Sequence, residues 1–163
     1  AAAVRLDEPV GAQDLGAGLR CRARCVGRRA HRTSPKRPGQ LLRISEALTK
    51  LGPAAKDLQP VFVTIDPARD TPEALKSYLS NFAPGYVGLT GSAEDVAVMA
   101  RAYRVYYAKV DNADAPGSYT MDHSALIYLM DAKGRFLKHF TDKSGDAAAL
   151  AQQIEAALKA VQE

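Results

Sequence analysis

Residues 60–82 read PVFVTIDPARDTPEALKSYLSNF, and this stretch decides the fold class. The run Pro60–Ile65 is short, apolar and β-branched, which predicts a buried strand. A polar loop follows, in which Asp70 or Thr71 is expected to cap a helix with Pro72 in its first turn. Apolar residues then recur at helical spacing: Leu75, Tyr78, Leu79 and Phe82. The stretch is therefore predicted to form a strand, a loop and an amphipathic helix.

The neighbouring segments continue this alternation. Upstream, apolar residues at helical spacing predict a helix over Leu41–Leu51, which Gly52 ends. Downstream, Tyr86–Thr90 predicts a second short strand, and Val96–Tyr103 predicts another helix. The apolar run Val105–Val110 comes next, and a polar loop then extends from Asp111 to Ser118.

The C-terminal third is predicted to form a hairpin and a closing helix. Strands are expected at Ser124–Met130 and Arg135–Phe140, joined by the turn Asp131–Gly134. Leu150–Val161 has the spacing of an amphipathic helix. Alternating helices and strands indicate an α/β domain whose central sheet is covered on both faces. A hairpin followed by a terminal helix is typical of a thioredoxin-like domain, so we predict a thioredoxin-like fold with a central mixed sheet.

The first forty residues do not fit this pattern. Eight basic residues and no acidic ones lie between Ala17 and Gln40, whereas the rest of the chain carries 14 basic and 18 acidic residues. Arginines at alternate positions would place several charges on one face of a buried strand, which is costly when they are unpaired. We therefore divide the chain into an atypical basic segment, 1–40, expected to be exposed or disordered, and a thioredoxin-like domain, 41–163.

Composition narrows the function classes further. With 163 residues, 47% of them hydrophobic, the chain is long enough for one domain with a proper core. No apolar run is long enough to span a membrane. The N-terminus has neither an initiator Met nor a signal pattern, so we expect a processed or truncated piece. The basic block lacks interleaved aromatic residues for base stacking, which disfavours nucleic-acid binding.

Two cysteines and one histidine are candidates for chemistry. Cys21 and Cys25 both lie in the basic block, and at C-x-x-x-C spacing they can ligate a metal, form a redox pair or be unrelated thiols. His123 lies in Tyr119–Met130, interpreted as a polar loop that leads into an apolar strand. An imidazole at the mouth of a strand can be aimed at a site by a rigid sheet. The alternative for His123 is a loop histidine with a hydrogen bond near the sheet.

Several motifs in order give the chain a family resemblance. VTIDPARDTP at 63–72 resembles the V-D-P-x-R-D-T-P loop of the Sco/SenC family of copper-binding assembly factors. The resemblance continues through YVGLTG at 86–91, AYRVYY at 102–107 and DHSALIYLMD at 122–131. It extends from Leu41 to roughly Leu158.

The resemblance implies a fold, a metal and a role. It implies a thioredoxin-like domain with a copper site of two cysteine thiolates and one histidine, which matches His123 here. It also implies maturation of the copper centre of cytochrome c oxidase, with the copper-carrying oxidase subunit or other copper chaperones as partners, in the periplasm or on a membrane anchor that faces it. Soft thiolates favour Cu(I), and imidazole also binds Cu(II). A carboxylate such as Asp122 is a candidate to orient the ring.

The cysteines depart from the family pattern. The family has C-P-x-x-C-P just before the helix that begins here near Leu41, which places the two thiols near Thr33 and Arg37. Cys21 and Cys25 keep the spacing but lie twelve residues early. His31–Ser34 can be encoded by CAC CGG ACG TCn, and a shifted frame contains codons for Pro-Asp-Val, the usual interior of the motif. We hypothesise a local frameshift between about Ala17 and Gln40, which sequencing of the gene tests.

Three functions follow from these residues. The first is a copper-binding assembly factor with His123, Cys21 and Cys25 as ligands. The second is a thioredoxin-like thiol-disulfide oxidoreductase that uses the two cysteines, although such a pair normally lies at a helix N-terminus, where the helix dipole lowers the thiol pKa. The third is a remnant that has lost its metal site.

Other polar and aromatic residues are interpreted as structural. Asp66 is expected to end a strand, Arg69 to pair with a carboxylate and Asp70 to cap a helix. His31 is assigned to the basic block and His139 to a solvent-facing strand position. Three tyrosines are assigned to core and edge packing: Tyr103, Tyr106 and Tyr107.

Overall fold

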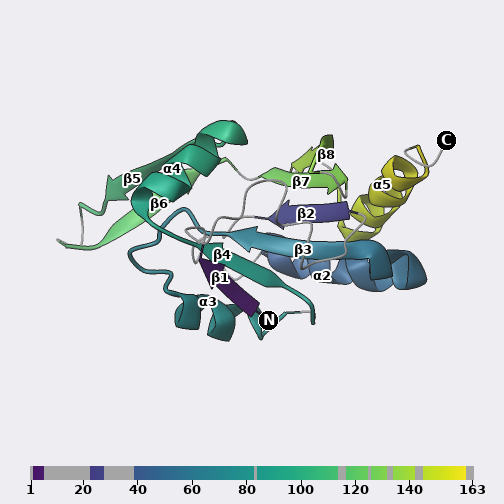
Figure 1. Cartoon of the computed structure of the whole chain (residues 1–163), viewed down its shortest axis with the longest axis horizontal. Helices are drawn as coiled ribbons and strands as arrows, with labels where there is room; N and C mark the ends of the chain where they lie inside the picture. Colours follow the sequence, from purple (N-terminus) through teal and green to yellow (C-terminus); the bar gives the residue numbers. More distant parts are fainter. Residues whose placement is uncertain are drawn as a thin grey trace.

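A computed structural model describes residues 2–5, 23–27, 39–82, 84–113, 117–124, 126–131, 134–141 and 145–160. In these ranges the strands form one large sheet and one separate hairpin (Figure 1). The sheet has the order β1-β4-β3-β2-β7-β8. Its strands are β1 (Ala2–Arg5), β2 (Ala23–Gly27), β3 (Leu58–Val63), β4 (Val87–Thr90), β7 (Leu126–Asp131) and β8 (Phe136–Thr141).

The sheet is mixed, as predicted. β1, β4, β3 and β2 run parallel to one another, whereas β7 runs antiparallel to both β2 and β8. The predicted strands at Pro60–Ile65 and Tyr86–Thr90 are confirmed as β3 and β4, and β3 begins and ends two residues early. β7 and β8 confirm the predicted C-terminal hairpin. The fold is thioredoxin-like.

The helices begin and end where their local sequence dictates. They are α2 (Gln40–Leu51), the short 3-10 helix η1 (Gly52–Asp57), α3 (Pro72–Leu79), α4 (Ala93–Ala102) and α5 (Ala147–Lys159). Gly52, with a φ of 56°, ends α2, because L side chains rarely adopt that conformation. Ser92 and Asp95 form a capping box at the start of α4. The side chain of Asp146 accepts hydrogen bonds from two backbone N–H groups at the start of α5.

Apolar side chains cover the sheet on both faces. Phe62 of β3 belongs to a core that includes residues of α2, α3 and α5. Its chain neighbours Val61 and Val63 point to the opposite face, where Met99 of α4 packs against their cluster. This alternation follows from the two-residue period of a strand. The predicted two-sided coverage is confirmed.

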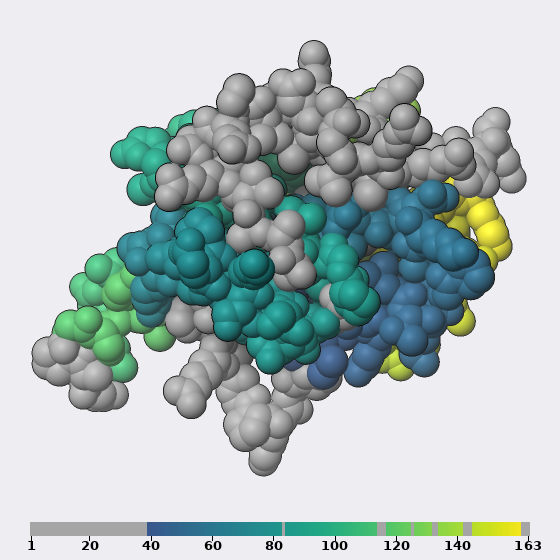
Figure 2. Space-filling view, turned by 60° about the horizontal axis from the view of Figure 1, so that its bottom comes forward, coloured from purple at the N-terminus to yellow at the C-terminus, as the bar shows by residue number. Residues whose placement is uncertain are grey.

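The second sheet is a hairpin that projects from the body of the molecule (Figure 1, left). It consists of β5 (Tyr107–Asp111) and β6 (Tyr119–His123), which pair antiparallel. The space-filling view shows the green residues of this region at the left edge, beside the blue and teal body (Figure 2). β6 was predicted to be part of a polar loop, and that prediction is wrong. None of the β6 side chains is fully buried, so the strand lacks the apolar run on which the prediction of strands relied.

The basic segment contributes at least two strands to the sheet. β1 pairs with β4, and β2 lies between β3 and β7. The backbone of these two runs is therefore paired rather than disordered, and the exposure of the basic segment stays a prediction. β2 occupies the place before α2 where a thioredoxin-like sheet needs its central strand. The rest of 1–38, including His31, lies outside the described residues.

Candidate functional site

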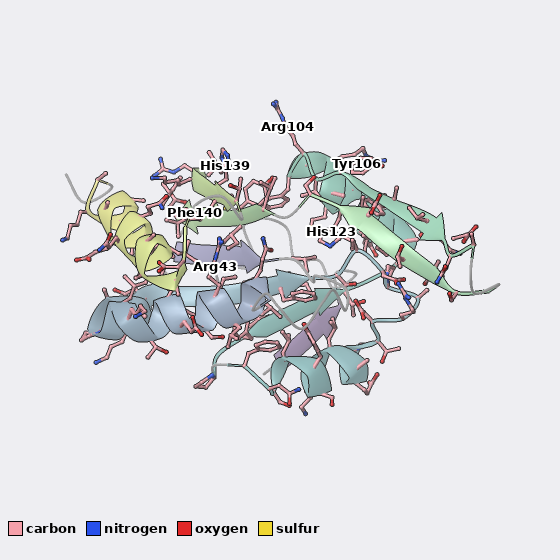
Figure 3. All side chains as sticks on the ribbon, turned by 180° about the vertical axis from the view of Figure 1, so that it is seen from behind. Arg43, Arg104, Tyr106, His123, His139 and Phe140 are labelled. Carbon is pink, nitrogen blue, oxygen red and sulfur yellow. The ribbon has the colours of Figure 1, made fainter. Side chains whose placement is uncertain are left out.

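His123 is the last residue of β6, where the hairpin meets the body of the molecule (Figure 3). It pairs with Tyr107 of β5, and its side chain is half-buried. β7 of the large sheet begins three residues later, at Leu126. The predicted position at a strand mouth therefore holds, although His123 is carried by a strand of its own rather than by a loop.

The imidazole of His123 has a defined partner. Its Nδ1 lies 3.2 Å from the backbone oxygen of Ser124. A carbonyl oxygen only accepts hydrogen bonds, so this contact favours the tautomer that carries the proton on Nδ1. In that tautomer Nε2 is the nitrogen that can bind a metal. Ser124 is itself held, because its backbone N–H donates to Tyr106 O at 3.1 Å.

Asp122 does not orient the ring. Successive residues of a strand point to opposite faces, so the side chains of Asp122 and His123 diverge. Asp122 pairs with Ala108 and is exposed. The idea that this carboxylate orients the histidine is therefore not supported, and the backbone oxygen of Ser124 takes that place.

A cluster of polar residues joins the hairpin to the loop after β3. The phenol of Tyr119, the first residue of β6, donates to Asp66 Oδ1 at 3.0 Å. Arg69 forms an ion pair with Asp66 and donates from its guanidinium to Tyr119 O at 3.1 Å. The guanidinium carbon also lies 3.9 Å from the centre of the Tyr119 ring, and Lys109 Nζ lies 4.2 Å from it. We call Asp66, Arg69 and Tyr119 the hairpin anchor.

The environment of Tyr119 shifts its ionisation. Desolvation raises the pKa of this phenol above its usual range, and the hydrogen bond to Asp66 raises it further. The phenol therefore keeps its proton, and with it the hydrogen bond to Asp66, at neutral pH. Tyr119 was missed as a functional candidate. The available signal was the alternation Tyr119-x-Met121-x-His123, which gives one face of a strand.

The charged loop after β3 is structural, as interpreted, with one correction. Arg69 pairs with Asp66, as expected. Asp70 is not the cap of α3, because Thr71 is the N-cap and its side chain accepts from Ala74 N. Asp70 is instead buried and accepts a hydrogen bond from Thr64 Oγ1 at 2.6 Å.

The remaining assigned residues are placed as follows. His139 lies on β8 and is exposed, as expected, far from His123 in Figure 3. Tyr103 packs edge-on against Tyr128 with their ring centres 5.8 Å apart, which agrees with a packing role. Tyr106 is 63% exposed, so its side chain is not part of the core.

The predicted ligand set can be followed only in part, because Cys21 and the side chain of Cys25 lie outside the described part of the chain. Cys25 lies within β2, where its backbone is opposite Pro60 of β3 and Leu129 of β7. Cys21 lies outside the described residues, as do Thr33 and Arg37, the positions where the family pattern places its thiols. Among the described side chains, no three His, Cys, Asp or Glu residues are grouped as a metal site. His123 is thus the candidate ligand whose geometry is defined.

The donor chemistry nevertheless suits copper. A neutral imidazole with Nδ1 engaged presents Nε2, and two thiolates would add the soft donors that favour Cu(I). Copper held by two thiolates and one imidazole would supply the capacity for metal transfer or redox chemistry. The chain's own contribution within the described residues is to fix the plane of His123 through Ser124 and to hold the hairpin through the anchor.

The fold and the site define a class of protein, namely a thioredoxin-like domain with a histidine displayed beside the sheet. Residues 38–159 match the SCO1/SenC family, and this chain belongs to that family. The SCO2-like protein of Rickettsia conorii is 44% identical over 103 residues, which are 63% of this chain and 50% of that protein.

Solved structures of the family agree with this fold. ScoI of Arabidopsis thaliana with copper bound superposes with a TM-score of 0.78 at 30% identity, covering 88% of each chain. ScoI of Bradyrhizobium japonicum with copper bound gives a TM-score of 0.72 at 36% identity, covering 86% of this chain and 88% of that one. The family includes mitochondrial members and a lipoprotein.

Two limits of the match bear on the site. The chain spans half the length of the Rickettsia conorii relative that it matches. The family match begins at residue 38, so Cys21 and Cys25 lie outside it, whereas His123 lies within it. Within the described residues, no helix has the length and apolar character needed to cross a bilayer.

Proposed function

We propose that this chain is a copper-binding assembly factor for the copper centre of cytochrome c oxidase, with His123 as a copper ligand. The observation that carries the proposal is the placement of His123 at the end of β6, with Nδ1 at 3.2 Å from Ser124 O and Nε2 left for a metal. Family membership and the copper-bound structures of relatives support it.

The proposal includes a compartment and partners. We infer a periplasmic location, which fits the family's thiolate chemistry outside the reducing cytoplasm. The copper-carrying oxidase subunit or another copper chaperone is the proposed partner. Copper transfer to a partner requires a ligand within reach of the surface, and His123 is half-buried rather than enclosed.

Cys21 and Cys25 remain the proposed thiol ligands, and the pairing of β2 restricts how Cys25 can reach copper. Cys25 lies in a strand that is paired on both sides. Reaching His123 with the Cys25 thiol would require either a suitable side-chain direction from the paired strand or separation of β2 from its neighbours. Breaking a paired central strand is costly, so we expect a copper-binding Cys25 thiolate to act from the intact strand.

A Cu(I) competition titration against a chromogenic chelator tests the proposal. The full chain is expected to bind one copper, and His123→Ala is expected to weaken binding at least tenfold. His139→Ala is the matched control, since it removes an exposed histidine from β8. The thiolate-to-Cu(II) charge-transfer band should be present in the wild type and the control and absent in His123→Ala.

The same titration separates the alternatives. Equal affinity of wild type and His123→Ala would contradict the assignment of this ligand. Unchanged binding in both Cys21→Ser and Cys25→Ser would remove the two thiols from the site. A wild-type chain that binds no copper would leave the remnant interpretation, in which the lineage's metal site has been lost here.

A further inference from the structure

The β5–β6 hairpin that carries His123 lacks a buried core of its own. Neither strand contains a fully buried side chain, whereas every residue of β4 is buried. An isolated two-stranded hairpin is marginally stable at best in water. The position of His123 therefore depends on what holds the hairpin to the rest of the molecule.

Tyr119 and His123 lie at opposite ends of one face of β6. Residues 119, 121 and 123 alternate with residues that point the other way. At about 3.3 Å per residue, the two side chains are separated by about 13 Å along the strand. Across the hairpin, Tyr119 pairs with Asp111, and His123 pairs with Tyr107. A constraint on Tyr119 therefore fixes the far end of the same strand face that presents the histidine.

The acceptor for the Tyr119 phenol is rigidly held. Asp66 is 7% exposed, and its backbone N–H donates to Thr64 Oγ1 at 2.9 Å. Its backbone oxygen accepts from Asp70 N at 3.0 Å. Thr64 in turn is fully buried and bonded to Asp70. The hairpin anchor thus joins the exposed strand β6 to a buried part of the loop after β3.

We propose that Tyr119 is a positioning residue, whose hydrogen bond to Asp66 holds the β5–β6 hairpin and so sets the position of His123. The part of this proposal that concerns copper rests on the proposed function, and the part that concerns the hairpin stands without it. Arg69 reinforces the contact from the other side, by its bond to Tyr119 O and its position over the ring.

Tyr119→Phe is the test variant, because it keeps the ring over which Arg69 and Lys109 lie and removes only the hydroxyl. Tyr86→Phe is the matched control. It removes a phenol hydroxyl that donates to Leu41 O at 2.9 Å in the core, remote in the fold from the hairpin. Both variants keep an aromatic ring in place and are expected to fold.

Amide hydrogen exchange on the copper-free chain is the first measurement. Loss of a hydrogen bond to a carboxylate is expected to speed exchange in β5 and β6 by about 5- to 30-fold in Tyr119→Phe. Tyr86→Phe should leave the hairpin's exchange relative to the sheet unchanged. The ¹⁵N shifts of the His123 imidazole should also change in Tyr119→Phe and not in the control.

Copper affinity is the second measurement. A histidine that spends less time in its binding position lowers apparent affinity in proportion, so Tyr119→Phe is expected to raise the copper dissociation constant about 3- to 10-fold. Hairpin exchange and imidazole shifts equal to the wild type would overturn the proposal, as would equal changes in Tyr86→Phe. If the wild type binds no copper, the proposed function fails while the exchange data still decide whether Tyr119 holds the hairpin.

Discussion

The large sheet and the β5–β6 hairpin are held by different physical means. β3 and β4 are almost entirely buried, and the apolar side chains on both of their faces belong to the core. β5 and β6 have no fully buried side chain and are joined to the body in part by the polar hairpin anchor. Changes in the sheet should therefore alter global stability, whereas changes in the hairpin should alter the position of His123 at little cost in stability.

The strongest way to test this difference is to remove a large side chain from the sheet. Phe62 is fully buried in β3, so Phe62→Ala is expected to lower the free energy of unfolding by about 3–5 kcal/mol. Phe136 on β8 is 55% exposed and contacts the rings of Tyr128 and His139. Phe136→Ala should cost less than about 1 kcal/mol, because little apolar area is lost from the core. Denaturant unfolding followed by circular dichroism measures both, and equal losses would contradict the comparison.

A smaller loss of stability is expected from a substitution where the sheet packs closely against α3. A Cβ atom added to Gly88 of β4 would lie 2.8 Å from Leu79 Cδ1 and 3.4 Å from Leu75 Cβ. Gly88→Ala should therefore lower the free energy of unfolding by about 1–3 kcal/mol through overpacking. Gly39→Ala is the control, since nothing lies within 4 Å of its added Cβ. A Gly88→Ala variant as stable as the wild type would show that this helix is loosely packed.

The hairpin should respond to high pH before the sheet does. The pKa of Tyr119 is raised, so the protonated phenol is favoured in the folded state. Its contribution is fully present below the ordinary phenol pKa of about 10 and is lost as the pH rises through the higher folded value. The protection of the hairpin amides, relative to the base-catalysed intrinsic exchange rate, should fall above about pH 10 in the wild type and show no such step in Tyr119→Phe. Identical pH profiles would mean that ionisation of Tyr119 does not release the hairpin.

The smallest effect is expected on the exposed surface of the hairpin. Val110 of β5 is 43% exposed, and Val110→Thr keeps the β-branched shape. The free energy of unfolding and the copper affinity should both stay within about 0.5 kcal/mol of the wild type. A large loss in either would show that this surface is covered by something in the folded protein.

Much of the fold could be predicted because its elements have strong local signals. Thr71 and Pro72 start α3, Gly52 ends α2, and apolar runs mark β3 and β4. β6 could not be predicted in the same way. Its residues alternate between half-buried and exposed without an apolar stripe, so its strand conformation depends on pairing with β5.

Only part of the candidate site could be predicted from the sequence, because some of its contacts join residues that are far apart in the chain. His123 was identified from its place before an apolar strand and from the family motif, and its geometry is consistent with a ligand. Tyr119 was missed because its role depends on Asp66, which is 53 residues away in the chain. The two cysteines could be recognised as a pair, but their spacing does not show that Cys25 lies in a strand paired on both sides.

The sequence by itself determined the α/β class, most of the helices and strands, and His123 as the residue to examine, because capping, periodicity and motif order are local properties. Tertiary structure decided that β2, despite Arg24, pairs within the large sheet, that Ser124 rather than Asp122 meets the imidazole, and that Tyr119 joins the hairpin to a buried carboxylate. These contacts connect residues through hydrogen bonds across strands and loops, and a linear pattern carries no information about which strand lies beside which.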